Sequence, residues 1–216
     1  MSLYPFQRTA FKNLCTKLRN SDSTLVCMPT GTGKTHVFSH ACEKAKGRTL
    51  VLAHREELVH QAAAKIRLAG VVPEIEMGLY KATADDSPWP SARCVVASVQ
   101  SLNAKYGGFG GKKRMHKFMD GFSLLVIDEA HHAASPSYQK VIDWMRRNNS
   151  NLKVIGFTAT PDRMDELRLP FDNVAYNYDL PTAISDGYLV PIEQKTVYIN
   201  SLDFNEVELS RANGDF

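Results

Sequence analysis

A phosphate-binding loop is predicted at residues 28–35, which read MPTGTGKT. Gly31 and Gly33 would let successive backbone N–H groups point at phosphate oxygens. The Lys34 ammonium would reach the β- and γ-phosphates of a nucleotide, and the Thr35 hydroxyl would bind Mg²⁺. The segment begins on methionine where the usual G-x-x-x-x-G-K-[ST] pattern has glycine. It nevertheless follows an apolar run and precedes a helical pattern, which is the context that such a loop requires.

Two adjacent carboxylates form the second candidate group. Asp128 and Glu129 follow the apolar run at 124–127, which would place them at the carboxyl edge of a sheet, where open α/β folds bind ligands. There Asp128 would serve Mg²⁺ directly or through water, and Glu129 would polarise the attacking water. Together with the phosphate-binding loop they predict an ATP site. His131 and His132 are adjacent and do not project to one side, so we expect no metal beyond Mg²⁺.

Two threonines close a further apolar run. Residues 158–161 read TATP and follow the run at 154–157. Hydroxyl groups at a strand end near the carboxylates can link the state of the nucleotide to neighbouring structure, although the same four residues would also suit an ordinary turn. Thr158 and Thr160 are therefore coupling candidates in combination with the ATP site.

The elements that must position these groups alternate along the chain. Short runs rich in Val, Leu and Ile predict strands buried on both faces, which is typical of a parallel sheet. Segments with apolar residues three or four apart predict helices that cover the sheet. We expect strands at 24–28, 49–53, 94–97, 123–127 and 153–157, and helices at 5–19, 35–46, 56–68 and 137–148. This order predicts an α/β fold, a three-layer sandwich with a mostly parallel central sheet.

The pattern is weaker outside these elements. Residues 106–117 (YGGFGGKKRMHK) form a glycine-rich, basic interruption. We interpret it as a mobile solvated loop that is poorly ordered without ligand, with a loop that stacks on bases or contacts phosphates as the alternative. Further on, 182–187 predicts a short capped helix and 190–198 another strand, while 200–216 is polar and irregular.

Composition excludes several classes of protein. The 216 residues are 44% hydrophobic and 23% charged, which is typical of a globular chain with a core and excludes disordered and collagen-like proteins. No apolar stretch is long enough to cross a bilayer, and the N-terminus lacks the pattern of a secretion signal. Four cysteines without CxxC spacing predict reduced thiols, so we expect a cytoplasmic protein without membrane contact. The net charge of +3 permits an acidic partner without requiring one.

Taken in order, GTGKT, DEAH and TAT resemble the first RecA-like domain of superfamily 2 helicases and translocases. YPFQ at 4–7 is similar to the element whose glutamine recognises adenine. VLAHREEL at 51–58 resembles motif Ia of the family, and VASVQSL at 96–102 resembles motif Ib. The spellings DEAHH and GFTATPDR are most similar to type III restriction res subunits, RadD-type proteins and XPB-like translocases. The resemblance covers about residues 3 to 200 and implies a RecA-like P-loop fold.

The resemblance also implies roles for individual residues, which would bind ATP with Mg²⁺ and act on nucleic acid. The spelling favours DNA over RNA. Catalysis would involve Lys34, Asp128 and Glu129, and Mg²⁺ would be held by Thr35 and Asp128. Nucleotide contacts would come from Gln7, Thr30, Gly31, Thr32, Gly33, Lys34 and Thr35. Coupling of hydrolysis to movement would fall to His131, Thr158 and Thr160, and contacts to the backbone of one nucleic-acid strand to Arg55, Ser98 and Gln100. For Arg55, a surface charge at a helix start is an equally good interpretation.

The family uses two RecA-like domains that clamp ATP, and the second supplies arginines that accelerate phosphoryl transfer, typically by ~10³–10⁵. We therefore expect residues 1–200 to form the ATP-binding domain and 201–216 a connector toward a second domain of a longer protein. On that basis the 216-residue chain would bind nucleotide with little or no turnover. The alternatives are another P-loop ATPase or kinase, a nucleotide-gated binding module, and a Mg²⁺ nuclease, although the nuclease would leave the phosphate-binding loop unexplained.

Overall fold

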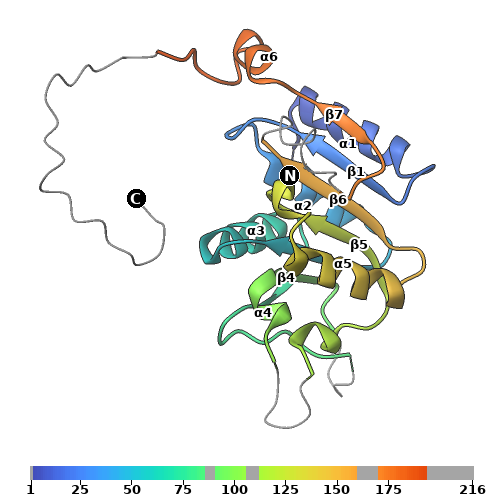
Figure 1. The fold of residues 1–216 in the computed structure, drawn as a ribbon. Coiled ribbons are helices and arrows are strands. Elements are labelled where there is room, and N and C mark those ends of the chain that lie inside the picture. Colours follow the sequence, from blue (N-terminus) through green and yellow to red (C-terminus); the bar gives the residue numbers. More distant parts are fainter. Residues whose placement is uncertain (1, 86–90, 106–111, 160–169, 194–216) are drawn as a thin grey trace, which may run out of the picture.

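The computed structural model describes residues 2–85, 91–105, 112–159 and 170–193. Seven strands form one parallel sheet in the order β3-β4-β2-β5-β6-β1-β7, and Figure 1 shows β7, β1, β6, β5 and β4 in that sequence. The strands are β1 (Ser23–Cys27), β2 (Arg48–Ala53), β3 (Pro73–Glu76), β4 (Cys94–Ser98), β5 (Phe122–Ile127), β6 (Lys153–Thr158) and β7 (Val174–Asn177). The predicted fold class is confirmed, and each paired strand is parallel to its neighbours.

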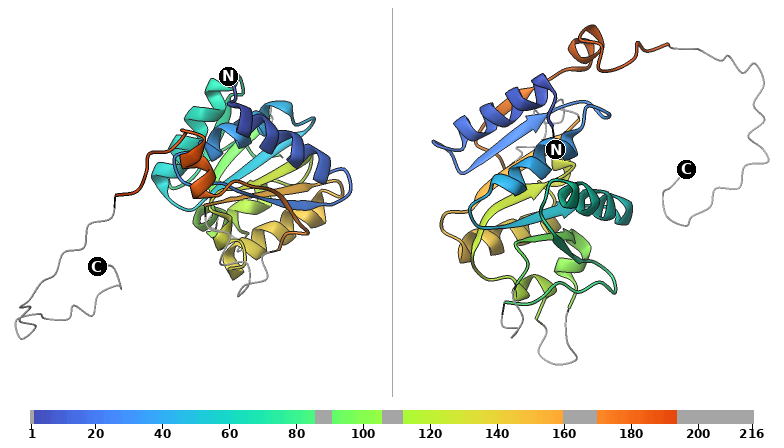
Figure 2. Two further views of the ribbon diagram at one scale, coloured as in Figure 1. Left: turned by 90° about the horizontal axis from the view of Figure 1, so that it is seen from above. Right: turned by 180° about the vertical axis from the view of Figure 1, so that it is seen from behind.

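Helices cover both faces of this sheet. They are α1 (Pro5–Lys17), α2 (Lys34–Lys44), α3 (Glu56–Leu68), α4 (Val99–Asn103), α5 (Pro136–Asn148) and α6 (Leu180–Ser185), with short 3₁₀ helices η1 (Arg114–Lys117) and η2 (Ala130–His132). One core packs α1, α2 and α3 on the sheet, and the other packs α4 and α5 on the opposite face. Figure 2 shows α1 and α5 on opposite sides of the strands.

Alternation along each central strand divides its residues between these two cores. In β1, Val26 belongs to the core beneath α1 and α2, whereas Leu25 and Cys27 belong to the core beneath α5. In β2, Val51 and Leu52 are divided in the same way. Successive side chains of a strand point to opposite faces, so a strand buried on both sides is largely apolar. This requirement explains why the central strands were visible as apolar runs.

Two edge strands were not predicted, and one predicted strand is not found where the structure describes it. The strands β3 and β7 were not predicted, because each has only four residues and mixes polar with apolar side chains. The strand expected at 190–198 is wrong where the structure describes it, since residues 190–193 belong to no strand and the rest lie outside the described residues. The short helix expected at 182–187 is confirmed as α6.

The described end of the basic insert, residues 112–117, contains a short helix with buried side chains, which corrects its interpretation as a solvated loop there. Residues 106–111 lie outside the described residues, but Arg114 and Lys117 are buried on the same carboxylate, that of Glu76. The Lys117 Nζ atom lies 2.8 Å from Glu76 Oε2, and the Arg114 guanidinium bonds Oε1. Arg114 also donates to the carbonyl oxygens of Gly78 and Tyr80, at 3.0 and 2.8 Å. This buried cluster fastens the end of β3 to η1.

Candidate ATP site at the carboxyl edge of the sheet

The phosphate-binding loop follows β1 and leads into α2. Gly31 and Gly33 have φ values of 88° and 80°, in the left-handed region that glycine adopts without strain. A Cβ atom on Gly33 would lie 2.6 Å from the Gln7 side chain, and one on Gly31 would lie 3.2 Å from Leu189. Both glycines are therefore required by backbone conformation and by close packing, and the loop curls as a phosphate cradle must.

Gln7 holds this loop from α1. Its side-chain Nε2 donates to the backbone oxygen of Thr32 at 2.8 Å, and its Oε1 accepts from the backbone N–H of Tyr4 at 3.0 Å. These two bonds fix the orientation of the amide. Beside it a cavity of about 300 Å³ is lined by Tyr4, Gln7, the loop glycines and Tyr188. The predicted adenine contact stays a prediction, and the structure adds that Gln7 holds the glycine loop in place through Thr32.

The Lys34 side chain is buried against the loop, with 8% of its surface exposed. Its Nζ donates to the backbone oxygen of Met28 at 3.2 Å. Burial lowers the pKa of this ammonium, and the carboxylates of Glu129 and Asp128 oppose that shift. A buried ammonium that faces carboxylates across a cavity is suited to binding an anion, and a triphosphate is such an anion.

Asp128 and Glu129 directly follow β5 and lie beside this lysine. Burial raises the pKa of Asp128 to about 6, and the neighbouring Glu129 carboxylate adds to the shift. Among the described residues other than glycine, Glu129 alone has a positive φ, 50°. That conformation turns the chain sharply into η2. Glu129 Oε2 lies 3.4 Å from Nδ1 of His131, so the turn places the second carboxylate next to the first histidine of η2.

One cavity of about 270 Å³ joins the loop to these carboxylates. It brings together Thr30, Gly31, Gly33, Lys34, Thr35, Asp128 and Glu129, as sequence analysis predicts for an ATP site. It is also lined by His36 and by three residues of α3 that were not predicted, Leu58, Gln61 and Lys65. Their spacing of three and four residues places them on one face of the helix. This spacing is the sequence pattern that could have indicated a helix face turned toward the site.

The predicted coupling and nucleic-acid residues are distributed over the same edge. Thr158 ends β6, is fully buried, and its backbone oxygen accepts the Met28 N–H at 2.9 Å, whereas Thr160 lies outside the described residues. Arg55 precedes α3 and Gln100 lies in α4, and both are exposed. Ser98 is different, because its hydroxyl is buried and accepts the Ser101 N–H at 3.2 Å as the cap of α4. The predicted nucleic-acid contact of Ser98 stays a prediction, and the structure adds that its hydroxyl caps α4.

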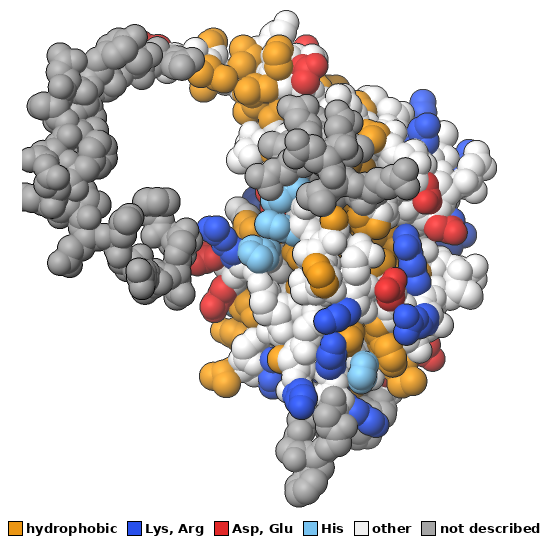
Figure 3. Space-filling model, in the orientation of Figure 1, with side chains coloured by type: hydrophobic (Ala, Val, Ile, Leu, Met, Phe, Trp, Pro, Cys, Tyr) orange, Lys and Arg blue, Asp and Glu red, His pale blue; other side chains and the backbone are white. Residues whose placement is uncertain are grey.

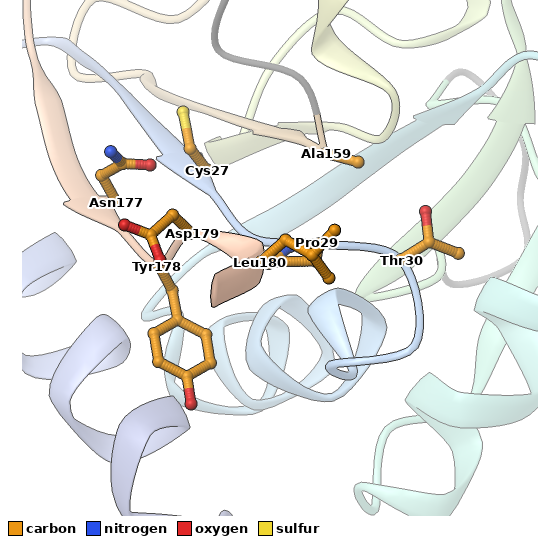
Figure 4. Close-up of a pocket in the computed structure, with 8 residues that line it drawn as sticks. All are labelled: Cys27, Pro29, Thr30, Ala159, Asn177, Tyr178, Asp179 and Leu180. Carbon is orange, nitrogen blue, oxygen red and sulfur yellow. The ribbon is translucent and has the colours of Figure 1, made fainter. Parts of the chain in front are cut away.

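A larger cavity of about 580 Å³ lies beside the loop, at the ends of β1, β6 and β7. Figure 4 shows Thr30 and Ala159 at one end of it and Asn177 and Tyr178 at the other. Its acid, Asp179, accepts the Thr182 N–H at 2.8 Å as the cap of α6. Since that carboxylate already serves a structural role, this cavity offers less chemistry than the one around Lys34.

Asp128→Asn is expected to stabilise the free protein by ~3 kcal/mol near neutral pH. The folded-state pKa of Asp128 is about 6, above its usual value of 3.8. The folded state therefore holds the extra proton between these values, and stability falls as pH rises through that window. Asparagine carries no charge to bury and escapes the penalty. Urea unfolding of both proteins across this pH range measures the difference.

Asp143 supplies the matched control, because it is an exposed carboxylate on α5. Asp143→Asn should leave the pH dependence of stability unchanged, while Asp128→Asn should flatten it. Identical unfolding curves for Asp128→Asn and the unsubstituted protein at neutral pH would show that the buried charge carries no cost.

The described residues contain neither a cluster of metal-binding side chains nor a membrane-spanning helix. In those residues no group of three His, Cys, Asp or Glu side chains is placed to hold a metal ion. The Thr35 and Asp128 oxygens fit Mg²⁺ nevertheless, because this ion usually takes one or two protein carboxylates together with phosphates and water. Among the same residues, no helix has the length and apolar character needed to span a bilayer.

The parallel sheet, the glycine-built loop and the carboxylate pair define a RecA-like ATP-binding domain of the helicase type. The chain belongs to the ResIII family, the type III restriction enzyme res subunit, whose family model matches residues 1–163. Several curated relatives of the chain are described as ATP-dependent helicases.

Two curated relatives illustrate the match. The chain is 30% identical over 224 residues to "Putative ATP-dependent helicase IRC3" of Saccharomyces cerevisiae, with 95% of this chain and 30% of the relative covered. It is 27% identical over 222 residues to "ATP-dependent DNA helicase mph1" of Neurospora crassa, with 96% and 18% covered. The chain thus spans less than a third of the length of these relatives.

Solved structures share the fold. The Type ISP restriction-modification enzyme LlaGI, in complex with a DNA substrate mimic, superposes with a TM-score of 0.62 at 16% identity, over 87% of this chain and 21% of that chain. The Pyrococcus furiosus Hef helicase domain gives a TM-score of 0.55 at 24% identity, over 78% and 37%. At these identities the likeness supports the fold and no more.

Proposed function

We propose that this chain is the ATP-binding domain of an ATP-dependent helicase or translocase that acts on DNA. The observation that carries the proposal is the buried Lys34 ammonium, which faces Asp128 and Glu129 across a cavity floored by glycine backbone. Burial makes the ammonium costly, Asp128 and Glu129 offset part of that cost, and nucleotide phosphates would supply a further anion in direct contact with it. The named relatives, which include ATP-dependent DNA helicases, support the same assignment.

Each residue at the site has a role in this proposal. The backbone of Thr30 to Thr35 and the Lys34 side chain hold the phosphates, and Gln7 positions that loop beside the base cavity. Thr35 and Asp128 would hold Mg²⁺, which supplies charge neutralisation for phosphoryl transfer. Glu129 orients the attacking water and accepts its proton. Transfer of the phosphoryl group to water, with ADP as the leaving group, completes the reaction.

The partners follow from the same assignment. One strand of DNA would lie on the surface that exposes Arg55 and Gln100, held through its phosphates. A second RecA-like domain of the parent protein would close on the ATP, with residues 1–200 as the first domain and 201–216 as the connector. His131, Thr158 and Thr160 would transmit hydrolysis to that closure. All four cysteines are free thiols, which supports a reducing compartment such as the cytoplasm.

Binding and turnover test the proposal together. Binding of AMP-PNP is measured with and without Mg²⁺ on the 216-residue chain. ATP hydrolysis is measured on the longest form that its gene encodes, with single-stranded DNA, duplex DNA or RNA. We expect Mg²⁺-dependent binding and hydrolysis that DNA stimulates more than RNA does. Absence of nucleotide binding, transfer of the phosphoryl group to an acceptor other than water, or stimulation by RNA alone would each contradict it.

A further inference from the structure

A continuous row of side chains joins Glu129 to the exposed Gln100. Glu129 Oε2 lies 3.4 Å from His131 Nδ1, and the rings of His131 and His132 have centroids 4.1 Å apart. The His132 ring stacks on His54, at 4.5 Å with 28° between planes. His54 Nδ1 lies 3.4 Å from Gln100 Nε2. We call His131, His132 and His54 the histidine row.

Three separate parts of the chain meet in this row. His54 follows β2 and precedes Arg55, His131 and His132 belong to η2, and Gln100 lies in α4. A cavity of about 560 Å³ opens beside it, lined by all three histidines and by Arg55 and Glu129. Figure 3 shows a group of histidine side chains (pale blue) on this face, with a further histidine apart from them. The row therefore joins elements that the sheet alone would leave as independent loops.

The His132 ring stacks on His54, and the rings of His131 and His132 are in contact at a tilt of 48°. A metal site needs donor atoms that converge on one point. Among the described residues, no group of three or more His, Cys, Asp or Glu side chains is placed to hold a metal ion. Stacked aromatic rings transmit position, since sliding one ring off the other loses about 0.5–1.5 kcal/mol of contact energy. This energy corresponds to roughly a twofold to tenfold change in an equilibrium constant.

The backbone at Glu129 gives the row a way to act on the ATP site. Glu129 begins η2 with its φ of 50°, so the direction of its carboxylate is tied to the position of the two histidines that follow. A strand bound at Arg55 and Gln100 would fix His54, and through the stack it would fix His132 and η2. The same contacts would act in reverse when nucleotide fixes Glu129.

We propose that the histidine row couples oligonucleotide binding to nucleotide binding within this single domain, with His54 and His132 as positioning residues. The inference rests on the proposed function, and it adds the path by which bound nucleotide and bound DNA affect each other. It makes Gln100 the outer end of the path and Glu129 the inner end. The coupling needs no second domain, because every contact in the row lies inside this chain.

Binding of both probes to the 216-residue chain measures this coupling. The dissociation constant of a labelled single-stranded oligodeoxynucleotide is determined with and without saturating AMP-PNP and Mg²⁺. The ratio of the two constants in the unsubstituted chain is expected to be about 5–10, within the usual range for coupled sites. His54→Ala and His132→Ala should each bring it to about 1–2, and the double variant should lose no more than either single variant.

Two further variants separate position from folding. His132→Phe keeps a flat ring on His54 and should retain most of the ratio of the two dissociation constants. A variant that fails to fold is recognised separately, because it would also lose binding of AMP-PNP. His60→Ala removes a histidine of α3 whose ring contacts Tyr80 at 5.4 Å, outside the row, and should leave the ratio unchanged.

The outcomes distinguish this inference from the proposed function. If the unsubstituted chain binds both probes but its ratio is 1, or if His54→Ala and His132→Ala keep the original ratio, the row does not couple the sites while the proposed function stands. If the chain binds no AMP-PNP or no oligonucleotide, the proposed function fails and the inference fails with it.

Discussion

Glu129→Gln is expected to reduce ATP hydrolysis by ~10²–10⁴, the usual contribution of a positioned general base, while nucleotide binding is retained. The amide has the size of the carboxylate but cannot accept the proton of the attacking water. Glu129 lies at the rim of the cavity, with 30% of its side chain exposed, so the exchange should not disturb packing. Steady-state hydrolysis by the longest form that the gene encodes, measured beside AMP-PNP binding, gives the two quantities.

An exposed carboxylate on the same edge provides the comparison. Glu56 is in the first turn of α3 with 70% of its side chain exposed, and Glu56→Gln should hydrolyse ATP at the unsubstituted rate. Undiminished turnover by Glu129→Gln would remove Glu129 from the reaction. Loss of nucleotide binding in the same variant would instead give this carboxylate a role in holding the ligand.

Lys34→Ala should weaken nucleotide binding by roughly 100-fold, since a hydrogen bond to a charged group contributes up to about 3 kcal/mol. The ammonium lies in the cavity between the glycine loop and the two carboxylates. Without it, the phosphates would face Asp128 and Glu129 with less positive charge to balance them. Titration of AMP-PNP in the presence of Mg²⁺ measures the loss.

Lys44 is the natural control for this substitution. It ends the same helix, its side chain is exposed, and its ammonium lies 2.8 Å from Glu43 outside the cavity. Lys44→Ala should bind AMP-PNP as tightly as the unsubstituted chain, with an unchanged melting temperature. Equal affinities for Lys34→Ala and Lys44→Ala would place the phosphates elsewhere.

The centre of the fold was predictable because one physical demand acts on it. Strands such as β1 and β5 are buried on both faces, so their central positions are apolar and the run is visible without knowledge of its partners. The phosphate-binding loop and the Asp128–Glu129 pair were visible for a related reason. Each directly follows such a run, and parallel strands end at one edge of the sheet.

The rest depended on partners distant in sequence. The charges of Arg114 and Lys117 indicate a solvated loop until Glu76, from an edge strand of four residues, is placed between them. The Gln7 contact with the Thr32 backbone also needs the fold, since α1 precedes the sheet and no local pattern shows where it docks. Contacts of this kind follow from three-dimensional packing and leave no periodic signal in the sequence.

The position of β1 in the sheet has a consequence for how the protein is made. This strand carries the phosphate-binding loop, yet its hydrogen-bonded neighbours are β6 and β7, which are synthesised after all the other strands of the described sheet. Pairings between segments so far apart form slowly, because a long loop must close before any contact stabilises it. Until then the nascent chain exposes an apolar strand with two unpaired edges. During synthesis, β1 is therefore the strand that chaperones would need to protect. A ligand that binds the loop after β1 would stabilise that same strand once its pairing is complete.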